Sequence, residues 1–171
     1  MSEIELKIVL DEAGLAALHD RLKVLGLAGP AVRPRNLHSV YYDSVDGRLG
    51  AAGIALRLRK DGRRWLQTVK ARAQLAGGLS RVEESEGPAP GGRLDLARLP
   101  DPALGALVTK TLDGAALAPV FETEMTRLSQ ALSLPGDGSA ELAIDRGTIR
   151  AGERAEPFAE AELELKTGAP A

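Results

Sequence analysis

Cysteine is absent from this chain, which excludes disulfides and thiolate metal sites and favours a reducing compartment, so we expect a cytoplasmic protein. Only two histidines occur, too few to favour a zinc site of the usual kind. Aromatic residues make up 3% of the chain, so few rings are available to stack on a nucleotide base. These shortages leave carboxylates and basic side chains as the groups that carry any chemistry.

The chain also lacks an excess of charge of one sign. Its formal net charge is −2, so no basic field indicates a nucleic-acid partner, and any anion-binding charge must be local. No segment approaches transmembrane length, and the N-terminus has no basic region followed by an apolar run, so we expect neither a membrane partner nor a signal peptide. A length of 171 residues fits one domain with a real core.

What the chain does have is strict alternation at its start. Within residues 2–10 the charged residues stand at alternate positions, so a strand there would place Glu3, Glu5 and Lys7 on one face and apolar side chains on the other. One such strand alone is best explained by a face that water screens.

A second acidic strand closes the chain over residues 159–166 and places Glu160, Glu162 and Glu164 together. Two acidic strands, with basic strands between them, favour a different interpretation. We expect both to face a shared cavity in which carboxylate oxygens hold a hard divalent cation such as Mg²⁺ or Mn²⁺.

Basic alternation fills the middle of the chain. Residues 53–60 and 65–72 are predicted to form a hairpin that turns at Asp61 and Gly62. Its cationic face would carry Arg57 and Arg59 from the first strand and Thr68, Lys70 and Arg72 from the second. On spacing alone, an exposed cationic edge that guards against aggregation explains this face about as well as phosphate binding does.

Three later runs also alternate. They align Arg81 with Glu83 and Ser85, Arg127 with Thr123 and Met125, and Glu141 with Asp145. Neither a buried parallel sheet nor an open antiparallel sheet explains polar positions that are sorted by strand. A closed barrel does, because opposite charges then neutralise one another in its lumen, and such a lumen suits a polyanion held with a metal.

The remaining segments are predicted to be structural. Asp11 can cap a helix that runs to about Leu25, and a second helical region from Leu94 to about Leu112 is interrupted by Pro100 and Pro102. Both are expected on the outside of the sheet. Loop arginines are expected to face solvent, namely Arg33, Arg35, Arg63 and Arg64.

Several of these motifs carry a family resemblance. They are Glu3-x-Glu5-x-Lys7, Tyr41-Tyr42-Asp43, Ala55-Leu56-Arg57-Leu58-Arg59, Thr68-Val69-Lys70 and the terminal acidic strand. In this order they resemble the CYTH domain of the triphosphate tunnel metalloenzymes. Residues 77–83, 119–127 and 144–147 are similar to the bacterial inorganic triphosphatase branch, which is often fused to a CHAD domain.

The resemblance implies an α+β fold in which eight antiparallel strands close into a tunnel and a few helices pack outside. It implies hydrolysis of inorganic triphosphate, or of another polyphosphate, with Mg²⁺ or Mn²⁺. Carried over by position, the catalytic residues would be Glu3, Glu5, Lys7 and Arg59. The phosphate-binding residues would be Lys7, Arg57, Arg59, Lys70, Arg81 and Arg127. The metal-binding residues would be Glu3, Glu5, Glu83, Glu141, Asp145, Glu162 and Glu164.

Alternatives remain open at this point. The same tunnel could serve a nucleoside or thiamine triphosphatase or an adenylate cyclase, and a non-catalytic module that binds polyphosphate or a nucleotide is a further class. Ser85 favours the module, because relatives often carry an acid at its position. The chain also stops where relatives continue, so we expect one CYTH-type domain over residues 1–171, cut short before a C-terminal helix and a CHAD domain.

Overall fold

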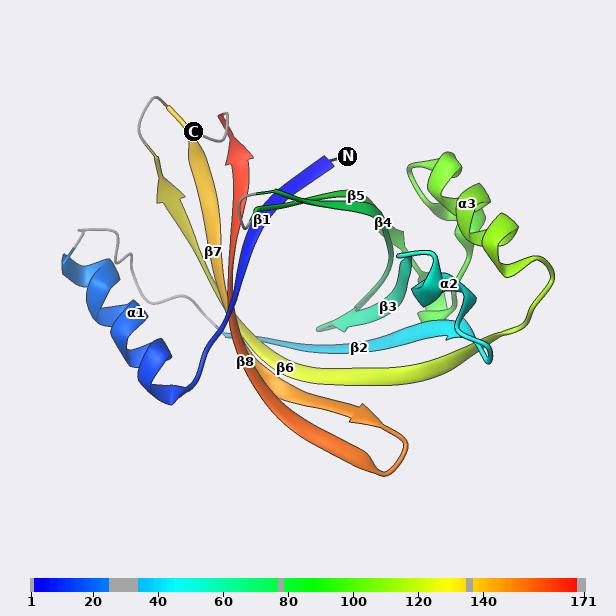
Figure 1. The fold of residues 1–171 in the computed structure, drawn as a ribbon, viewed down its shortest axis with the longest axis horizontal. Coiled ribbons are helices and arrows are strands. Elements are labelled where there is room, and N and C mark those ends of the chain that lie inside the picture. Colours follow the sequence, from blue (N-terminus) through cyan, green and yellow to red (C-terminus); the bar gives the residue numbers. More distant parts are fainter. Residues whose placement is uncertain (1, 25–33, 77–78, 135–136, 169–171) are drawn as a thin grey trace.

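The computed structural model describes residues 2–24, 34–76, 79–134 and 137–168, and its eight antiparallel strands close into a barrel (Figure 1). Around the barrel the strand order is β1-β5-β4-β3-β2-β6-β7-β8. The strands are β1 (Ser2–Val9), β2 (Arg35–Ser44), β3 (Ala55–Asp61), β4 (Arg64–Ala76), β5 (Leu79–Pro88), β6 (Leu117–Ser133), β7 (Ser139–Ala151) and β8 (Arg154–Thr167). The eight-stranded closed barrel expected from the sequence is confirmed.

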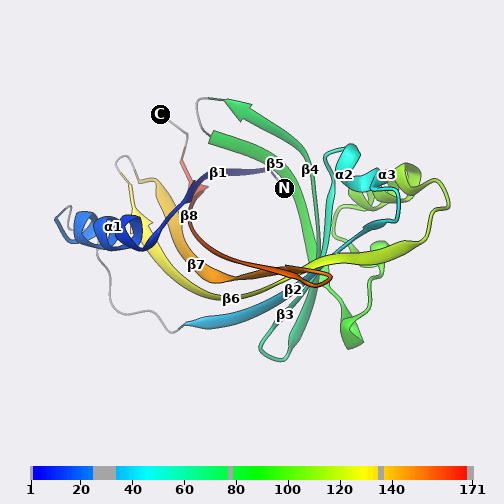
Figure 2. The same ribbon diagram turned by 60° about the horizontal axis from the view of Figure 1, so that its bottom comes forward.

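Three α-helices lie outside the barrel (Figure 1, Figure 2): α1 (Glu12–Val24), α2 (Arg48–Ala51) and α3 (Pro102–Leu112). None of the helices in the described ranges has both the length and the apolar character needed to cross a membrane.

The main hydrophobic core lies between the barrel wall and α2 and α3, on one side of the ring (Figure 1). Leu49 of α2 and Leu104 and Val108 of α3 pack there against Leu56 of β3 and Val69 of β4, all at most 1% exposed. The apolar faces of β3 and β4 therefore point outward to helices, which leaves their opposite, polar faces to line the lumen.

Both expected helical regions are found. The second one divides at the prolines into a short 3-10 turn, Leu96–Arg98, and α3, whose first residue is Pro102. The carboxylate of Asp101 accepts the backbone N–H of Ala103 at 2.9 Å and caps α3.

The first helix packs on the other side of the barrel. Asp11 Oδ1 accepts the N–H of Gly14 at 2.7 Å, as expected for its cap. Leu22 of α1 contacts an outer cluster that includes Leu142 of β7 and Ala161 of β8. The expected end at Leu25 falls outside the described residues.

A buried carboxylate fixes the connection from β2 to α2. Asp43 accepts the backbone N–H groups of Ser44 at 2.7 Å, Leu49 at 2.8 Å and Gly50 at 2.9 Å. Burial alone would raise the pKa of Asp43, but these backbone donors hold it below its ordinary value. Asp43 thereby ties a lumen strand to the helical layer.

Candidate active site

The lumen of the barrel holds a cavity of about 620 Å³ to which all eight strands contribute. Its charged lining consists of eight carboxylates and six cationic side chains. The acids are Glu3, Glu5, Glu84, Glu86, Asp145, Glu160, Glu162 and Glu164, and the bases are Lys7, Arg35, Arg57, Arg59, Lys70 and Arg127. Because acids outnumber bases, a polyanion needs additional positive charge in order to enter.

Three of these acids form a candidate metal site. Asp145 of β7 and Glu160 and Glu162 of β8 each offer a carboxylate oxygen, and these oxygens lie within 4.8 Å of one another. They are hard ligands of the kind that Mg²⁺ and Mn²⁺ prefer, and Mg²⁺ is commonly held by one or two carboxylates together with substrate phosphates. The donor set therefore fits the metal that the resemblance implies.

Two cations stabilise the charge of this acidic cluster. Arg127 Nε donates to Asp145 at 2.8 Å and Arg127 Nη2 to Glu162 at 2.6 Å, while Lys7 Nζ lies 2.6 Å from Glu162. Burial would raise the pKa of Glu162, but Arg127 and Lys7 hold it below its ordinary value. The pKa of Glu160 is raised, first by burial and also by Glu162. Glu162 is therefore the ionised centre of the cluster.

A second ionic cluster joins β1, β4 and β5. Lys70 Nζ lies 2.6 Å from Glu3 and 2.8 Å from Glu84. Burial and the hydrogen bond with Glu3 raise the pKa of Glu84 to about 7, whereas the pKa of Glu3 is lowered because the bonds with Glu84 and Lys70 outweigh its burial. The two carboxyl groups therefore share one proton near neutral pH.

The basic wall of the lumen comes from β3. Arg57 Nη2 donates to Thr68 Oγ1 at 3.1 Å and lies 3.6 Å from Glu86. Arg59 Nε donates to Ser39 Oγ at 3.0 Å, and within the described ranges no carboxylate lies at ion-pair distance from it. Burial, followed by repulsion from Arg57 and Arg127, lowers the pKa of Arg59 to about 10. Glu86 opposes this lowering from beyond ion-pair distance, so among the described residues Arg59 has no directly paired anion.

The structure brings most of the predicted site residues to this cavity. The residues from the predicted sets that line it are Glu3, Glu5, Lys7, Arg57, Arg59, Lys70, Arg127, Asp145, Glu162 and Glu164. Their inward placement follows from the charge alternation, whereas their metal- and phosphate-binding roles stay predictions.

Arg81 and Glu83 were expected to face the lumen, and this placement is wrong. Arg81 is exposed and Glu83 pairs with Arg72 at 2.7 Å on the outer side. The pairing of β4 with β5 shifts between Ala71 and Gln74, where Arg72 adopts a φ of 55°, so the bulge also turns Arg72 away from the side of Lys70.

Ser85 shares the strand face of Arg81 and Glu83, so it also lies outside the lumen, where its Oγ accepts the N–H of Asp101 at 3.0 Å. Glu84 and Glu86 face the lumen instead, so the serine leaves no gap in the acidic lining. Glu141 shares the alternation of Asp145 and pairs in register with Glu164, but it is not among the residues that line the cavity.

Four charged lining residues were missing from the predicted sets. Glu160 belongs to the terminal acidic strand, and its alternation with Glu162 and Glu164 was the signal that it faces the lumen. Glu84 and Glu86 were left out of the predicted sets because the adjacent acids Glu83 and Glu84 fit either phase. Arg35 was expected to face solvent and is exposed, but it also lines the cavity at the start of β2. Of the other three loop arginines, Arg63 and Arg64 are exposed and Arg33 lies outside the described residues.

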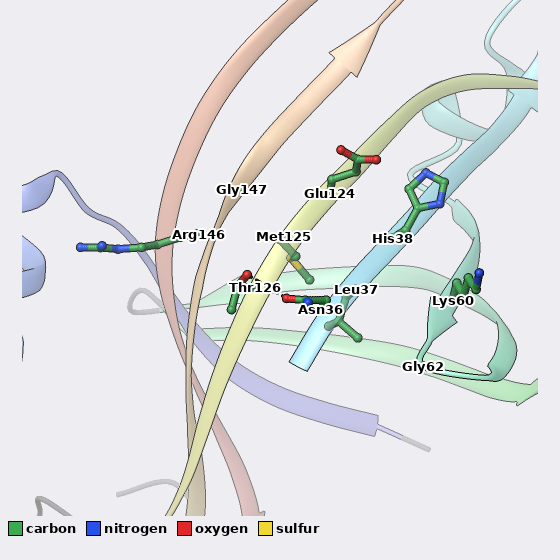
Figure 3. A pocket seen from close by; sticks show the side chains of 10 residues that line it. All are labelled: Asn36, Leu37, His38, Lys60, Gly62, Glu124, Met125, Thr126, Arg146 and Gly147. Atoms are coloured by element: carbon green, nitrogen blue, oxygen red, sulfur yellow. Dashed lines mark hydrogen bonds between the residues drawn. The ribbon is translucent and has the colours of Figure 1, made fainter. Parts of the chain in front are cut away.

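A second, more open depression of about 570 Å³ lies over the outer faces of β2, β6 and β7 (Figure 3). Glu124 is the single carboxylate among its described lining residues, and His38 beside it pairs with Glu122 at 2.9 Å. The depression therefore offers no set of acids for a metal, and the tunnel is the stronger candidate.

Comparisons with known proteins agree with this geometry. The CYTH domain family matches residues 1–171. An inorganic triphosphatase from Haemophilus influenzae is 30% identical over 137 residues, which are 77% of this chain and 36% of that protein. The chain thus spans about a third of the length of this relative.

Solved structures share the fold. HpAC1 from Hippeastrum, a candidate adenylyl cyclase with a dominant triphosphatase activity, has a TM-score of 0.57 at 20% identity, over 96% of this chain and 80% of that one. A candidate adenylate cyclase from Bacillus halodurans has a TM-score of 0.60 at 18% identity, over 96% and 81%. These likenesses concern the fold alone. From the family match over its whole length, this chain belongs to the CYTH domain family.

Proposed function

We propose that this chain hydrolyses inorganic triphosphate to diphosphate and phosphate inside the tunnel, with Mg²⁺ or Mn²⁺. One observation carries the proposal: Arg57 and Arg59 of β3 line the same lumen as the cluster of three carboxylates. The inorganic triphosphatase from Haemophilus influenzae supports the choice of substrate.

The basic residues would bind the substrate. Triphosphate concentrates negative charge on oxygens that repel an attacking water, and guanidinium groups match the geometry of these oxygens. Arg57 and Arg59 would donate to non-bridging oxygens, since Arg59 has no carboxylate partner among the described residues. Lys7 and Arg127, held by acids of the cluster, would contact the phosphate nearest to it.

The acidic residues would hold the metal. Asp145, Glu160 and Glu162 supply oxygen ligands, and a bound divalent ion there would neutralise phosphate charge and polarise the phosphorus–oxygen bonds. In the reaction, a water oxygen bonds to the terminal phosphorus while the bond from that phosphorus to the bridging oxygen breaks. The rate enhancement would come mainly from positioning and charge stabilisation.

One observation favours a second substrate class. Tyr41 and Phe121 line the cavity and stack with ring centroids 4.2 Å apart, at an interplanar angle of 13°. Where its rings border the cavity, this pair could contact the organic group of a nucleoside or thiamine triphosphate. ATP and thiamine triphosphate therefore belong in the assay.

The test measures phosphate release from triphosphate, ATP and thiamine triphosphate with Mg²⁺ or Mn²⁺. The variant Glu162→Gln removes a central carboxylate, and Glu124→Gln, on the outer face, is its matched control. We expect release from triphosphate that Glu162→Gln abolishes and Glu124→Gln preserves. Binding without turnover of every substrate would instead identify a non-catalytic module.

A further inference from the structure

Thr68 is a polar residue of the tunnel wall to which the proposed function gives no role. It lies in β4 between Arg57 of β3 and Glu86 of β5, and it pairs in register with both. All three residues line the cavity, and Thr68 is only 1% exposed. A buried hydroxyl therefore stands between a guanidinium and a carboxylate.

The hydrogen bonds of this hydroxyl have a fixed direction. Thr68 Oγ1 donates to Glu86 Oε2 at 3.0 Å and accepts from Arg57 Nη2 at 3.1 Å. Because a hydroxyl carries one proton, its bond to the carboxylate leaves only the oxygen lone pairs for the guanidinium. Glu86 also lies 3.6 Å from the same Nη2, so both contacts hold one end of Arg57.

Holding Arg57 in this orientation has a cost. Its Nε is buried and has no acceptor among the residues that the structure describes. A buried donor without a partner is unfavourable, so contacts elsewhere on the guanidinium must outweigh it. The contacts at Nη2 do this, and the one to the Thr68 hydroxyl is the shorter of the two.

The neighbouring arginine is held by its opposite end. Arg59 donates through Nε to Ser39 Oγ, so within the described ranges both of its terminal nitrogens stay available to a ligand. Arg57 is held through Nη2, and in the same ranges its Nη1 makes no hydrogen bond or ion pair. Arg59 can therefore bind a phosphate through two donors, whereas Arg57 offers one terminal donor whose direction depends on Thr68.

We propose that Thr68 is a positioning residue of the substrate site: together with Glu86 it fixes the guanidinium of Arg57 so that Nη1 donates to a phosphate oxygen. The inference rests on the proposed function, because it needs a phosphate in the lumen. Thr68 acts through Arg57 and takes no part in the bond changes. Loss of the hydroxyl leaves Arg57 charged but free to turn, so the effect belongs to binding more than to turnover.

The experiment removes the hydroxyl and measures the binding of inorganic triphosphate. Thr68→Val keeps a similar shape and loses both hydrogen bonds, whereas Thr68→Ser keeps the hydroxyl. Calorimetry with Mg²⁺ in the Glu162→Gln background gives the Kd without turnover, and phosphate release by the otherwise wild-type protein gives KM and kcat. We expect Thr68→Val to raise Kd and KM about fivefold with a smaller change in kcat, and Thr68→Ser to restore both to within about twofold of wild type.

A double-mutant cycle separates positioning from a structural role. In an Arg57→Gln background, Thr68→Val should change the Kd by less than about twofold, because no guanidinium remains to be oriented. A residue that only stabilised the barrel would weaken binding equally in both backgrounds. Thr126→Val, on the exposed face of β6 where Thr126 bonds to Asn36, is the matched control and should change nothing. Thr68→Ala, which also lacks the hydroxyl, replaces the valine variant if that variant does not fold.

The same loss of affinity in both backgrounds overturns the inference. If triphosphate is hydrolysed but Thr68→Val binds it as tightly as wild type, the inference fails and the proposed function stands. If no substrate is hydrolysed while triphosphate binding still depends on Thr68 through Arg57, the proposed activity fails and the positioning role stands. A complete lack of triphosphate binding overturns both.

Discussion

Replacing Arg59 by glutamine is expected to stabilise the metal-free fold while weakening the binding of triphosphate. Burial and the neighbouring Arg57 and Arg127 lower the pKa of Arg59 from 12.5 to about 10. At about 1.4 kcal/mol per pKa unit, this corresponds to ~3 kcal/mol of unfavourable interaction for the charged form. Glutamine removes that cost but also loses packing of the long side chain, so we expect a gain of about 1–2 kcal/mol in the free energy of unfolding.

Arg127→Gln is the matched comparison. Burial opposes the charge of Arg127 too, but Asp145 and Glu162 outweigh it and raise its pKa. Removing Arg127 leaves Asp145, whose side chain is 1% exposed, without its ion-pair partner. Loss of one member of a buried pair typically costs ~3–5 kcal/mol, so this variant should be destabilised.

The assay is chemical denaturation of wild type and both variants without metal or phosphate, followed by calorimetric titration of triphosphate in the presence of Mg²⁺. Opposite changes in stability, with weaker triphosphate binding by both variants, are expected. Destabilisation by Arg59→Gln of the size seen for Arg127→Gln would refute the reasoning, because it would show that Arg59 already has the counter-charge it needs.

Three other perturbations test the metal site and the fold. Glu162→Gln should weaken Mn²⁺ binding by at least about tenfold in calorimetry, since a ligand is lost, whereas Glu124→Gln should not. Glu5→Gln should abolish turnover and leave the circular dichroism spectrum unchanged, because Glu5 lines the cavity and is not part of the core; unfolding would instead make it structural. Asp43→Asn should cost ~1–3 kcal/mol in urea denaturation, since backbone donors lose a charged acceptor. Because the pKa of Asp43 is lowered, this stabilisation is present above its unfolded pKa near 3.8 and is lost as the pH falls further, so wild type and variant should converge in acid.

Charge alternation indicated a closed sheet with a charged interior and predicted most of its lining, whereas the eight-stranded tunnel was implied by the family resemblance. In β1 and β8 charged residues occupy one face only, and in β3 Lys60 alone departs from the face of Arg57 and Arg59, so one phase is favoured and Glu3, Arg59 and Glu162 fall inward. The apolar residues between them predicted the outer contacts with helices in the same way.

Charge alternation did not predict the inward face of a strand where both of its faces carry acids. In β5 the acids Glu83 and Glu84 are adjacent, so either face carries a carboxylate, and the choice is made by the bulge near Arg72 and by the burial of Ser85 under the segment that starts α3. Both are tertiary effects. Arg35 was missed for a related reason, since a residue that opens a strand has no preceding alternation to set its face.

The position of the packed core has a consequence for how this protein can change. Leu56 and Val69 hold the sheet from outside, through α2 and α3, while the lumen contributes mainly ionic contacts. Substitutions that swap one polar lumen side chain for another leave this outer packing untouched. Ligand preference can therefore diverge among homologous barrels while the scaffold persists, and redesign of selectivity can begin from the inner wall without rebuilding the helices.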